Sequence, residues 1–153
     1  MLFTSLMHAI IFCGIQASGK STFYKQRFFN SHVRISMDLL RTRHREHRLL
    51  LLCLETQARF AVDNTNPTIA ERQRYIGPAK QAGYHVVGYF FQSSTQAALS
   101  RNKERPAAEQ VPEKGIRGTR ARLEVPTFAE GFDELHYVSM GPDGTFVVEP
   151  WQL

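Results

Sequence analysis

Short apolar runs alternate along the chain with longer stretches in which apolar residues recur every three or four positions. Runs of this length are typical of buried strands, and the longer period is typical of helices that pack one face against a sheet. The pattern predicts strands at 9–13, 33–36, 60–63, 86–91 and 135–139, with a weaker one at 146–148. It predicts helices at 20–30, 38–43, 45–57, 69–82, 95–103 and 113–123. Strands that alternate with helices indicate an α/β fold of three layers, with a parallel central sheet flanked by helices.

Capping residues mark both ends of the helix predicted at 69–82, and one charged segment interrupts the alternation of strands and helices. Thr68 and Glu71 have the spacing of a capping box, and Gly83 follows the last expected residue of the same helix. Between 104 and 112 the pattern gives way to charged residues and proline, which predicts a mobile loop. Because 153 residues are the size of one ordinary domain, we expect a single domain over 1–153 with a small helical lid at about 101–118.

The composition is that of a globular domain. With 153 residues, 42% hydrophobic and 22% charged, the chain can bury a core without disulfides and is unlike disordered or coiled-coil sequences. The longest apolar run, 49–54, is far shorter than the roughly 20 residues that span a bilayer. The N-terminus lacks a basic region and a cleavage site, so we expect a cytoplasmic protein that does not contact membranes. Cys13 and Cys53 lie in apolar segments and are expected to be core thiols.

A glycine loop at 14–21 carries the strongest chemical signal. It reads G-x-x-x-x-G-K-S and joins the first predicted strand to the first helix, which predicts a three-layer P-loop NTPase fold. The backbone N–H groups of such a loop and the helix N-terminus cradle phosphates. We expect Lys20 to reach the β and γ phosphates and Ser21 to ligate Mg²⁺. The expected ATP-binding residues are Gly14, Ile15, Gln16, Ala17, Ser18, Gly19, Lys20, Ser21 and Thr22.

Other motifs narrow the class of enzyme. A GTPase needs Asn-Lys-x-Asp after a strand, whereas Asn102 and Lys103 are followed by Glu-Arg at the end of a helix. The chain is also short for the larger oligomeric ATPase modules, and the charged loop from Glu104 resembles the lid of a small phosphotransferase.

Asp38 and Arg41 follow the second predicted strand and, three positions apart, are expected on one helix face. The carboxyl ends of strands line the crevice of an open α/β sheet, so both side chains should point into the phosphate cleft. There, a carboxylate can accept the proton of an attacking hydroxyl, and a guanidinium can bind an acceptor phosphate. A first-turn carboxylate favoured by the helix dipole beside a solvated arginine is the alternative interpretation.

Two further pairs of polar residues are expected at the phosphate cleft. Asp63 and Asn64 follow the third strand, where an acidic residue commonly approaches the metal; an Asx turn would also explain them. Arg101 and Arg105, four positions apart, are expected on one face, where a closing lid could bring them onto the transferring phosphoryl group. A solvated basic helix end is the alternative.

Charge favours a polyanionic partner. The net charge is +5, and residues 41–48 hold four Arg and two His against one Glu. Such a run is usually a solvated face, but its place beside Asp38 favours a polyphosphate substrate over a small neutral one. No third ligand completes a metal set with His44 and His47.

With these motifs in the same order, the chain resembles the kinase domain of polynucleotide 5′-hydroxyl kinases from Ala9 to about Val138. The selective features are D-x-x-R at 38–41, D-N-T-N at 63–66 and R-x-x-x-R at 101–105, although many members carry Pro-Gly in place of Gln16 and Ala17. The resemblance implies a general base at Asp38, an acceptor-phosphate ligand at Arg41, phosphate and Mg²⁺ binding by Lys20 and Ser21, an acceptor or metal role for Asp63, and lid arginines at 101 and 105.

The resulting hypothesis is an ATP- and Mg²⁺-dependent kinase for the 5′-hydroxyl of DNA or RNA. Its catalytic residues would be Asp38, Lys20, Arg105 and Arg101, and its substrate-binding residues Arg41, Asp63 and Asn64. The alternatives are a kinase for a nucleoside, sugar or antibiotic and, outside enzymes, a nucleotide-binding regulatory module. In the leading hypothesis, phosphatase or ligase activity would come from separate partners.

Overall fold

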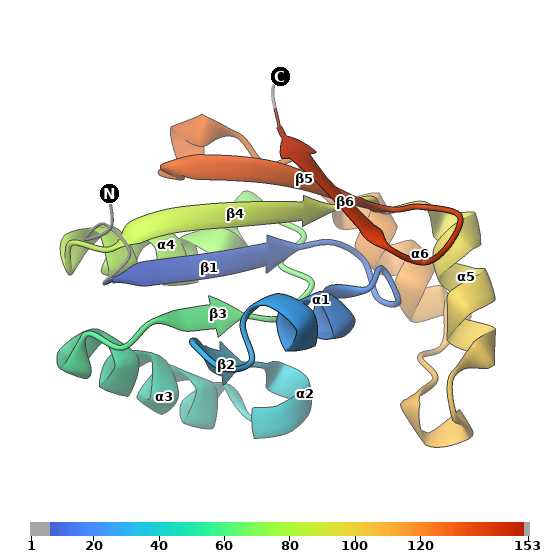
Figure 1. Cartoon of the computed structure of the whole chain (residues 1–153). Helices are drawn as coiled ribbons and strands as arrows, with labels where there is room; N and C mark the ends of the chain where they lie inside the picture. The colour runs from blue at the N-terminus through green and yellow to red at the C-terminus, as the bar shows by residue number, and fades with distance from the viewer. Residues whose placement is uncertain (1–6, 152–153) are drawn as a thin grey trace.

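A computed structural model describes residues 7–151 and contains a six-stranded sheet in the order β2-β3-β1-β4-β5-β6 (Figure 1). Its strands are β1 (His8–Cys13), β2 (Val33–Ile35), β3 (Phe60–Val62), β4 (His85–Phe91), β5 (Glu134–Met140) and β6 (Phe146–Pro150). β1 to β5 pair in parallel, as expected, whereas β6 runs antiparallel to β5. The predicted parallel central sheet is therefore confirmed, and β6 adds one antiparallel strand at its edge. A tight turn with Gly144 at φ 81° reverses the chain there, and only antiparallel strands can follow so short a connection.

Helices fill the connections between the parallel strands. They are α1 (Lys20–Arg27), α2 (Met37–Leu40), α3 (Arg43–Thr56), α4 (Ile69–Gln81), α5 (Thr95–Glu104) and α6 (Glu113–Arg122), with short 3₁₀ turns at η2 (Ala107–Glu109) and η3 (Phe128–Glu130). The capping box predicted for α4 is confirmed: the Thr68 hydroxyl accepts from Glu71 N–H, and the Glu71 carboxylate accepts from Thr68 N–H.

The sheet separates two hydrophobic layers, because successive side chains of a strand point to opposite faces. On one face, Ile11 and its neighbours pack against Leu50 of α3 and Tyr75 of α4. On the other face, Ile10 and Phe12 of the same strand pack against Phe23 of α1. The three-layer α/β architecture is therefore confirmed.

The helix is interrupted between α2 and α3, where the sequence predicted a continuous helix over 38–43. α2 ends at Leu40, and Arg41 has a φ of 74°, outside helical geometry. The reason is local: the Thr42 hydroxyl accepts from Arg45 N–H and caps a new helix, which begins at Arg43. The expected common helix face of Asp38 and Arg41 was therefore wrong.

The lid region is a pair of helices, α5 and α6, beyond the carboxyl ends of the strands (Figure 1). Ala98 and Ile116 from the two helices pack against Ile15 in the glycine loop. The segment between them, predicted to be a mobile loop, contains η2 and is clamped by Asn102, whose side chain both donates to Val111 C=O and accepts from Val111 N–H. The lid is thus built onto the phosphate loop through an apolar contact.

The fold also shows the surroundings of the two cysteines and the lengths of the helices. Both cysteines are free and buried, as expected of core thiols, and burial raises the pKa of Cys13 and of Cys53 to about 11. Within residues 7–151, every helix is too short or too polar to cross a lipid bilayer.

Candidate active site

A pocket of about 340 Å³ opens at the carboxyl ends of β1, β2 and β3. It brings together most of the predicted site residues: Gln16, Ala17, Gly19, Lys20, Ser21, Thr22, Asp38, Asp63, Asn64 and Arg105. Gly14, Ile15 and Ser18 are buried members of the same loop and do not line the pocket. Arg41 and Arg101 also lie outside its lining, whereas Arg43, to which the sequence assigned no role, is part of it.

The glycine loop is held tightly by its surroundings. Gly14 N–H donates to Thr65 C=O at 2.9 Å, and Ile15 N–H donates to the Ser93 hydroxyl at 3.2 Å. A Cβ on Gly14 would lie 2.8 Å from Phe91 Cβ, so this position requires glycine. Gly19 has a φ of 98°, which glycine adopts without strain. The loop is therefore fixed before any phosphate binds.

Lys20 is the buried cation of the pocket, with 8% of its surface exposed. Its ammonium donates to Ile15 C=O at 2.7 Å and to the Ser18 hydroxyl at 3.4 Å. Burial lowers the pKa of Lys20 from 10.5 to about 8; Asp63 opposes this shift and Arg105 adds to it. A desolvated ammonium that is only partly compensated is a strong site for a phosphate anion.

ATP affinity should therefore depend on pH. Because phosphates favour the charged ammonium, affinity should fall as the pH rises through 8, with a slope that approaches about tenfold per pH unit. Calorimetric titrations from about pH 7 to 9.5 would measure this. Lys20→Met should bind weakly with a flat profile, and a wild-type affinity that stays constant over this range would contradict the assignment.

The Ser21 hydroxyl and the Asp63 carboxylate lie next to each other in the pocket and place two kinds of oxygen atom side by side. The Ser21 hydroxyl donates to Asp63 Oδ2 at 3.0 Å, and Arg34 Nη2 lies 2.8 Å from the same carboxylate oxygen and 3.1 Å from Ser21 Oγ. A hydroxyl beside a carboxylate fits Mg²⁺, which prefers oxygen and completes its shell with water and substrate phosphates. No group of three or more His, Cys, Asp or Glu suited to a metal occurs among residues 7–151, so any Mg²⁺ depends on those additional ligands.

Arg34 is the residue of this cluster that the sequence reasoning missed. It pairs with Ala61 in the sheet, two positions before Asp63, and strand alternation therefore places Arg34 and Asp63 on one face. A charged residue inside an otherwise apolar strand was the available signal.

Asp38 faces the pocket from the first turn of α2. Its carboxylate is exposed and makes no hydrogen bond or ion pair within residues 7–151, so it is free to accept one. α2 itself is anchored, because Met37 N–H donates to Asn64 Oδ1 at 2.9 Å. Asn64 Nδ2 in turn donates to Glu46 at 2.8 Å.

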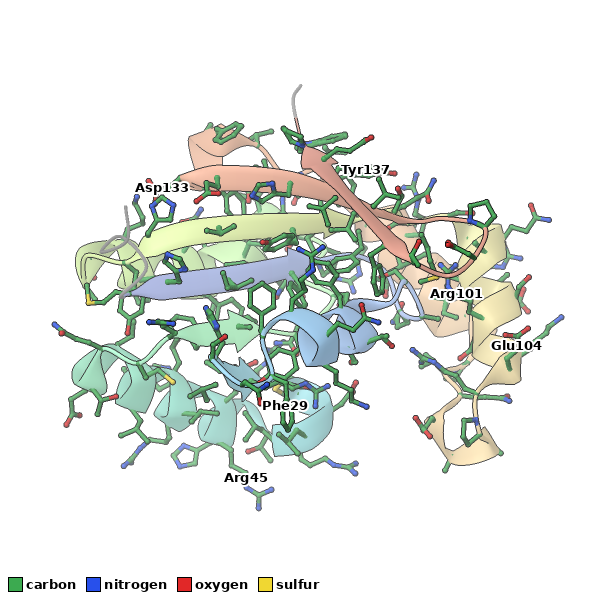
Figure 2. All side chains as sticks on the ribbon, viewed as in Figure 1. Phe29, Arg45, Arg101, Glu104, Asp133 and Tyr137 are labelled. Atoms are coloured by element: carbon green, nitrogen blue, oxygen red, sulfur yellow. The ribbon has the colours of Figure 1, made fainter. Side chains whose placement is uncertain are left out.

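Glu46 is the centre of a buried network behind α2. It is 2% exposed and accepts hydrogen bonds from Arg43 at 2.7 Å and from the Tyr75 hydroxyl at 2.8 Å. Thus one acid in the basic run 41–48 is buried, while other members of the run are solvated; Figure 2 shows Arg45 projecting from α3 away from the sheet. The network holds the backbone that carries Asp38.

The lid contributes two arginines in different ways. Arg101 Nε donates to Ala17 C=O at 2.6 Å and so ties α5 to the glycine loop. α5 ends at Glu104, so Arg105 is extended and does not share the expected helix face; its side chain lines the pocket. Burial, and secondarily the charge of Arg105, lowers the pKa of Arg101. The two guanidiniums therefore belong to one positive region beside Lys20.

The geometry agrees with comparisons to known proteins. A family model described as an AAA domain matches residues 10–126. The chain belongs to this family. The matched AAA domain, of the P-loop kinase-like type, contains the glycine loop, Asp38, Asp63 and the lid arginines.

Two curated relatives support the resemblance to polynucleotide kinases. The bifunctional polynucleotide phosphatase/kinase of Schizosaccharomyces pombe is 28% identical over 133 residues, which is 84% of this chain and 33% of the relative. A relative from Acanthamoeba polyphaga mimivirus, named for the same pair of activities, is 26% identical over 148 residues, or 92% of this chain and 35% of that protein. The chain thus spans about a third of the length of these relatives.

Solved structures share the fold. Kti12 from Chaetomium thermophilum, in complex with ADP-AlF3, has a TM-score of 0.64 at 16% identity, covering 86% of this chain and 88% of Kti12. A gluconokinase from Sinorhizobium meliloti has a TM-score of 0.58 at 17% identity, covering 88% and 83%. Because proteins of such different names share this architecture, the fold alone does not select an acceptor.

Proposed function

We propose that this P-loop kinase-like domain transfers the γ-phosphoryl group of ATP to the 5′-hydroxyl of a polynucleotide, DNA or RNA. The observation that carries the proposal is a pocket in which Asp38, a carboxylate without a hydrogen-bond or ion-pair partner among residues 7–151, faces a rigid phosphate loop and Lys20. The names of the two curated relatives support a polynucleotide acceptor.

In this reaction the protein mainly positions reactants and neutralises charge. Asp38 accepts the proton of the attacking hydroxyl, while Lys20 and Arg105 offset the charge on the transferring group. Arg101 holds the lid against the loop and adds positive charge. Ser21 and Asp63 would hold Mg²⁺, which would neutralise part of the negative charge on the ATP phosphates.

Label transfer from γ-labelled ATP tests the proposal directly. The acceptors are a 5′-hydroxyl oligonucleotide, the same oligonucleotide with a 5′-phosphate, a free nucleoside and a sugar. Label on the 5′-hydroxyl oligonucleotide alone is expected. Label on the nucleoside or sugar instead would favour a small-molecule kinase, and ATP binding without transfer to any hydroxyl would favour a regulatory module.

Arg41 supplies a second prediction. It lies outside the pocket lining, exposed at the break between α2 and α3, and we propose that it contacts the phosphate next to the terminal nucleoside. Arg41→Ala should raise the acceptor KM roughly threefold to tenfold and leave the ATP KM within about twofold. Steady-state kinetics with each substrate varied in turn would measure both; equal increases would point to another role.

Phosphatase or ligase activity is proposed to reside outside this domain. The two relatives are named for both a phosphatase and a kinase activity, and each is about three times longer than this chain. We propose that the region they share with this chain accounts for the kinase activity alone. Separate partners could then supply the other steps at the same nucleic-acid end.

A further inference from the structure

A second hollow of about 210 Å³ lies beside the candidate active site, between α3 and α4. It is lined by Arg43, Glu46, His47, Leu50, Arg74 and Tyr75. Arg43 lines both hollows, so they are neighbours on either side of one guanidinium-bearing side chain. None of the donor-side chemistry described above requires this second hollow.

The hollow has an apolar floor and a cationic rim. Leu50 and Tyr75 are 2% and 1% exposed and form the floor, whereas His47 and Arg74 are exposed. Neither His47 nor Arg74 makes a hydrogen bond or ion pair within the described residues 7–151. Their polar groups therefore remain available to a ligand.

Glu46, the acid of the hollow, is already compensated. Its carboxylate is 2.7 Å from Arg43 Nη1 and also accepts hydrogen bonds from Asn64 and the Tyr75 hydroxyl. The Arg43 side chain remains 51% exposed despite this pair. With Arg74 added, the lining keeps a net positive charge, which favours an anion over a cation.

We propose that this hollow binds the nucleotide that follows the 5′-terminal one in the acceptor strand. Its sugar and base lie over Leu50 and Tyr75, and the phosphodiester on its 3′ side lies between Arg43 and Arg74, with His47 at the edge. Apolar surface beside cations that track the backbone is the usual design of single-strand binding grooves. The inference rests on the proposed function, because it concerns the second nucleotide of a nucleic-acid strand whose 5′-hydroxyl lies at Asp38.

Arg74→Ala tests the inference, and Arg48→Ala is the matched control. Both substitutions remove one exposed arginine, and Arg48 lies on α3 outside both hollows. The two acceptors are a 5′-hydroxyl hexanucleotide and a nucleoside 3′-monophosphate, which keeps the 5′-hydroxyl but lacks a second nucleotide. Affinity for the hexanucleotide is measured separately by fluorescence anisotropy across a salt series, and thermal melting verifies that both variants fold.

Arg74→Ala should weaken hexanucleotide binding roughly threefold to tenfold and lower the slope of log affinity against log salt by about 0.7. Its loss of kcat/KM should be several times larger with the hexanucleotide than with the monophosphate. Arg48→Ala should match the wild type. If Arg74→Ala behaves like Arg48→Ala, or loses activity equally on both acceptors while the wild type labels both, the second subsite is wrong and the 5′-kinase activity stands. A wild type that labels neither acceptor overturns the proposed function and the subsite with it.

Discussion

Asp38→Asn should reduce turnover with a 5′-hydroxyl oligonucleotide by about 100- to 10,000-fold, the usual contribution of a general base. Asparagine keeps the shape of the side chain but cannot accept the hydroxyl proton. The fold should be unaffected, because Asp38 is exposed and makes no hydrogen bond or ion pair within residues 7–151. Single-turnover transfer, measured with saturating ATP, isolates this step from product release.

The affinity of the same variant for ATP should stay within about twofold of the wild type, because the glycine loop, and not Asp38, binds the ATP phosphates. Asp38 exerts only a minor influence on Lys20, raising its pKa slightly against the larger effect of burial. Glu55→Gln, which neutralises an exposed carboxylate on α3 outside the pocket, is the control and should transfer normally. Near-normal turnover by Asp38→Asn would rule out Asp38 as the base.

Arg72→Met should lower the free energy of unfolding by about 3–5 kcal/mol, because it leaves a buried carboxylate without its partner. Arg72 is fully buried, and its Nε and Nη2 donate to the Glu130 carboxylate at 2.7 and 3.0 Å. Its Nη1 donates to Asn66 C=O at 2.9 Å and Pro67 C=O at 3.1 Å. The guanidinium thus ties α4 to η3 and to the loop after β3, beside Asp63 and Asn64.

Urea denaturation of the single variants and of Arg72→Met/Glu130→Met would measure the coupling. Removing both partners should cost less than the sum of the single changes, since neither charge is then left unpaired. Additive losses would show that the pair is not coupled. Lys80→Met, which removes the more exposed ion pair with Asp133, should cost no more than about 1 kcal/mol and serves as the comparison.

Much of the candidate site was predictable from local sequence. The strand, glycine loop and helix around Lys20 are contiguous, and the positions of Asp38 and Asp63 follow from the ends of neighbouring parallel strands. The break at Arg41 was predictable as well, because Thr42 caps the following helix through a contact only three residues away. The predicted boundary, between helices at 38–43 and 45–57, falls a few residues after the real one between α2 and α3.

The alternation of strands and helices, the phosphate loop and the capping box of α4 follow from local sequence, because each depends on residues within a few positions of one another. The contacts of Arg34 with Ser21 and Asp63, and the burial of Glu46 as an anchor for α2, arise only in the folded chain. These contacts join residues 13 to 29 positions apart. Whether they form depends on strand register and helix docking, which are set by the packing of the whole core and not by any local pattern.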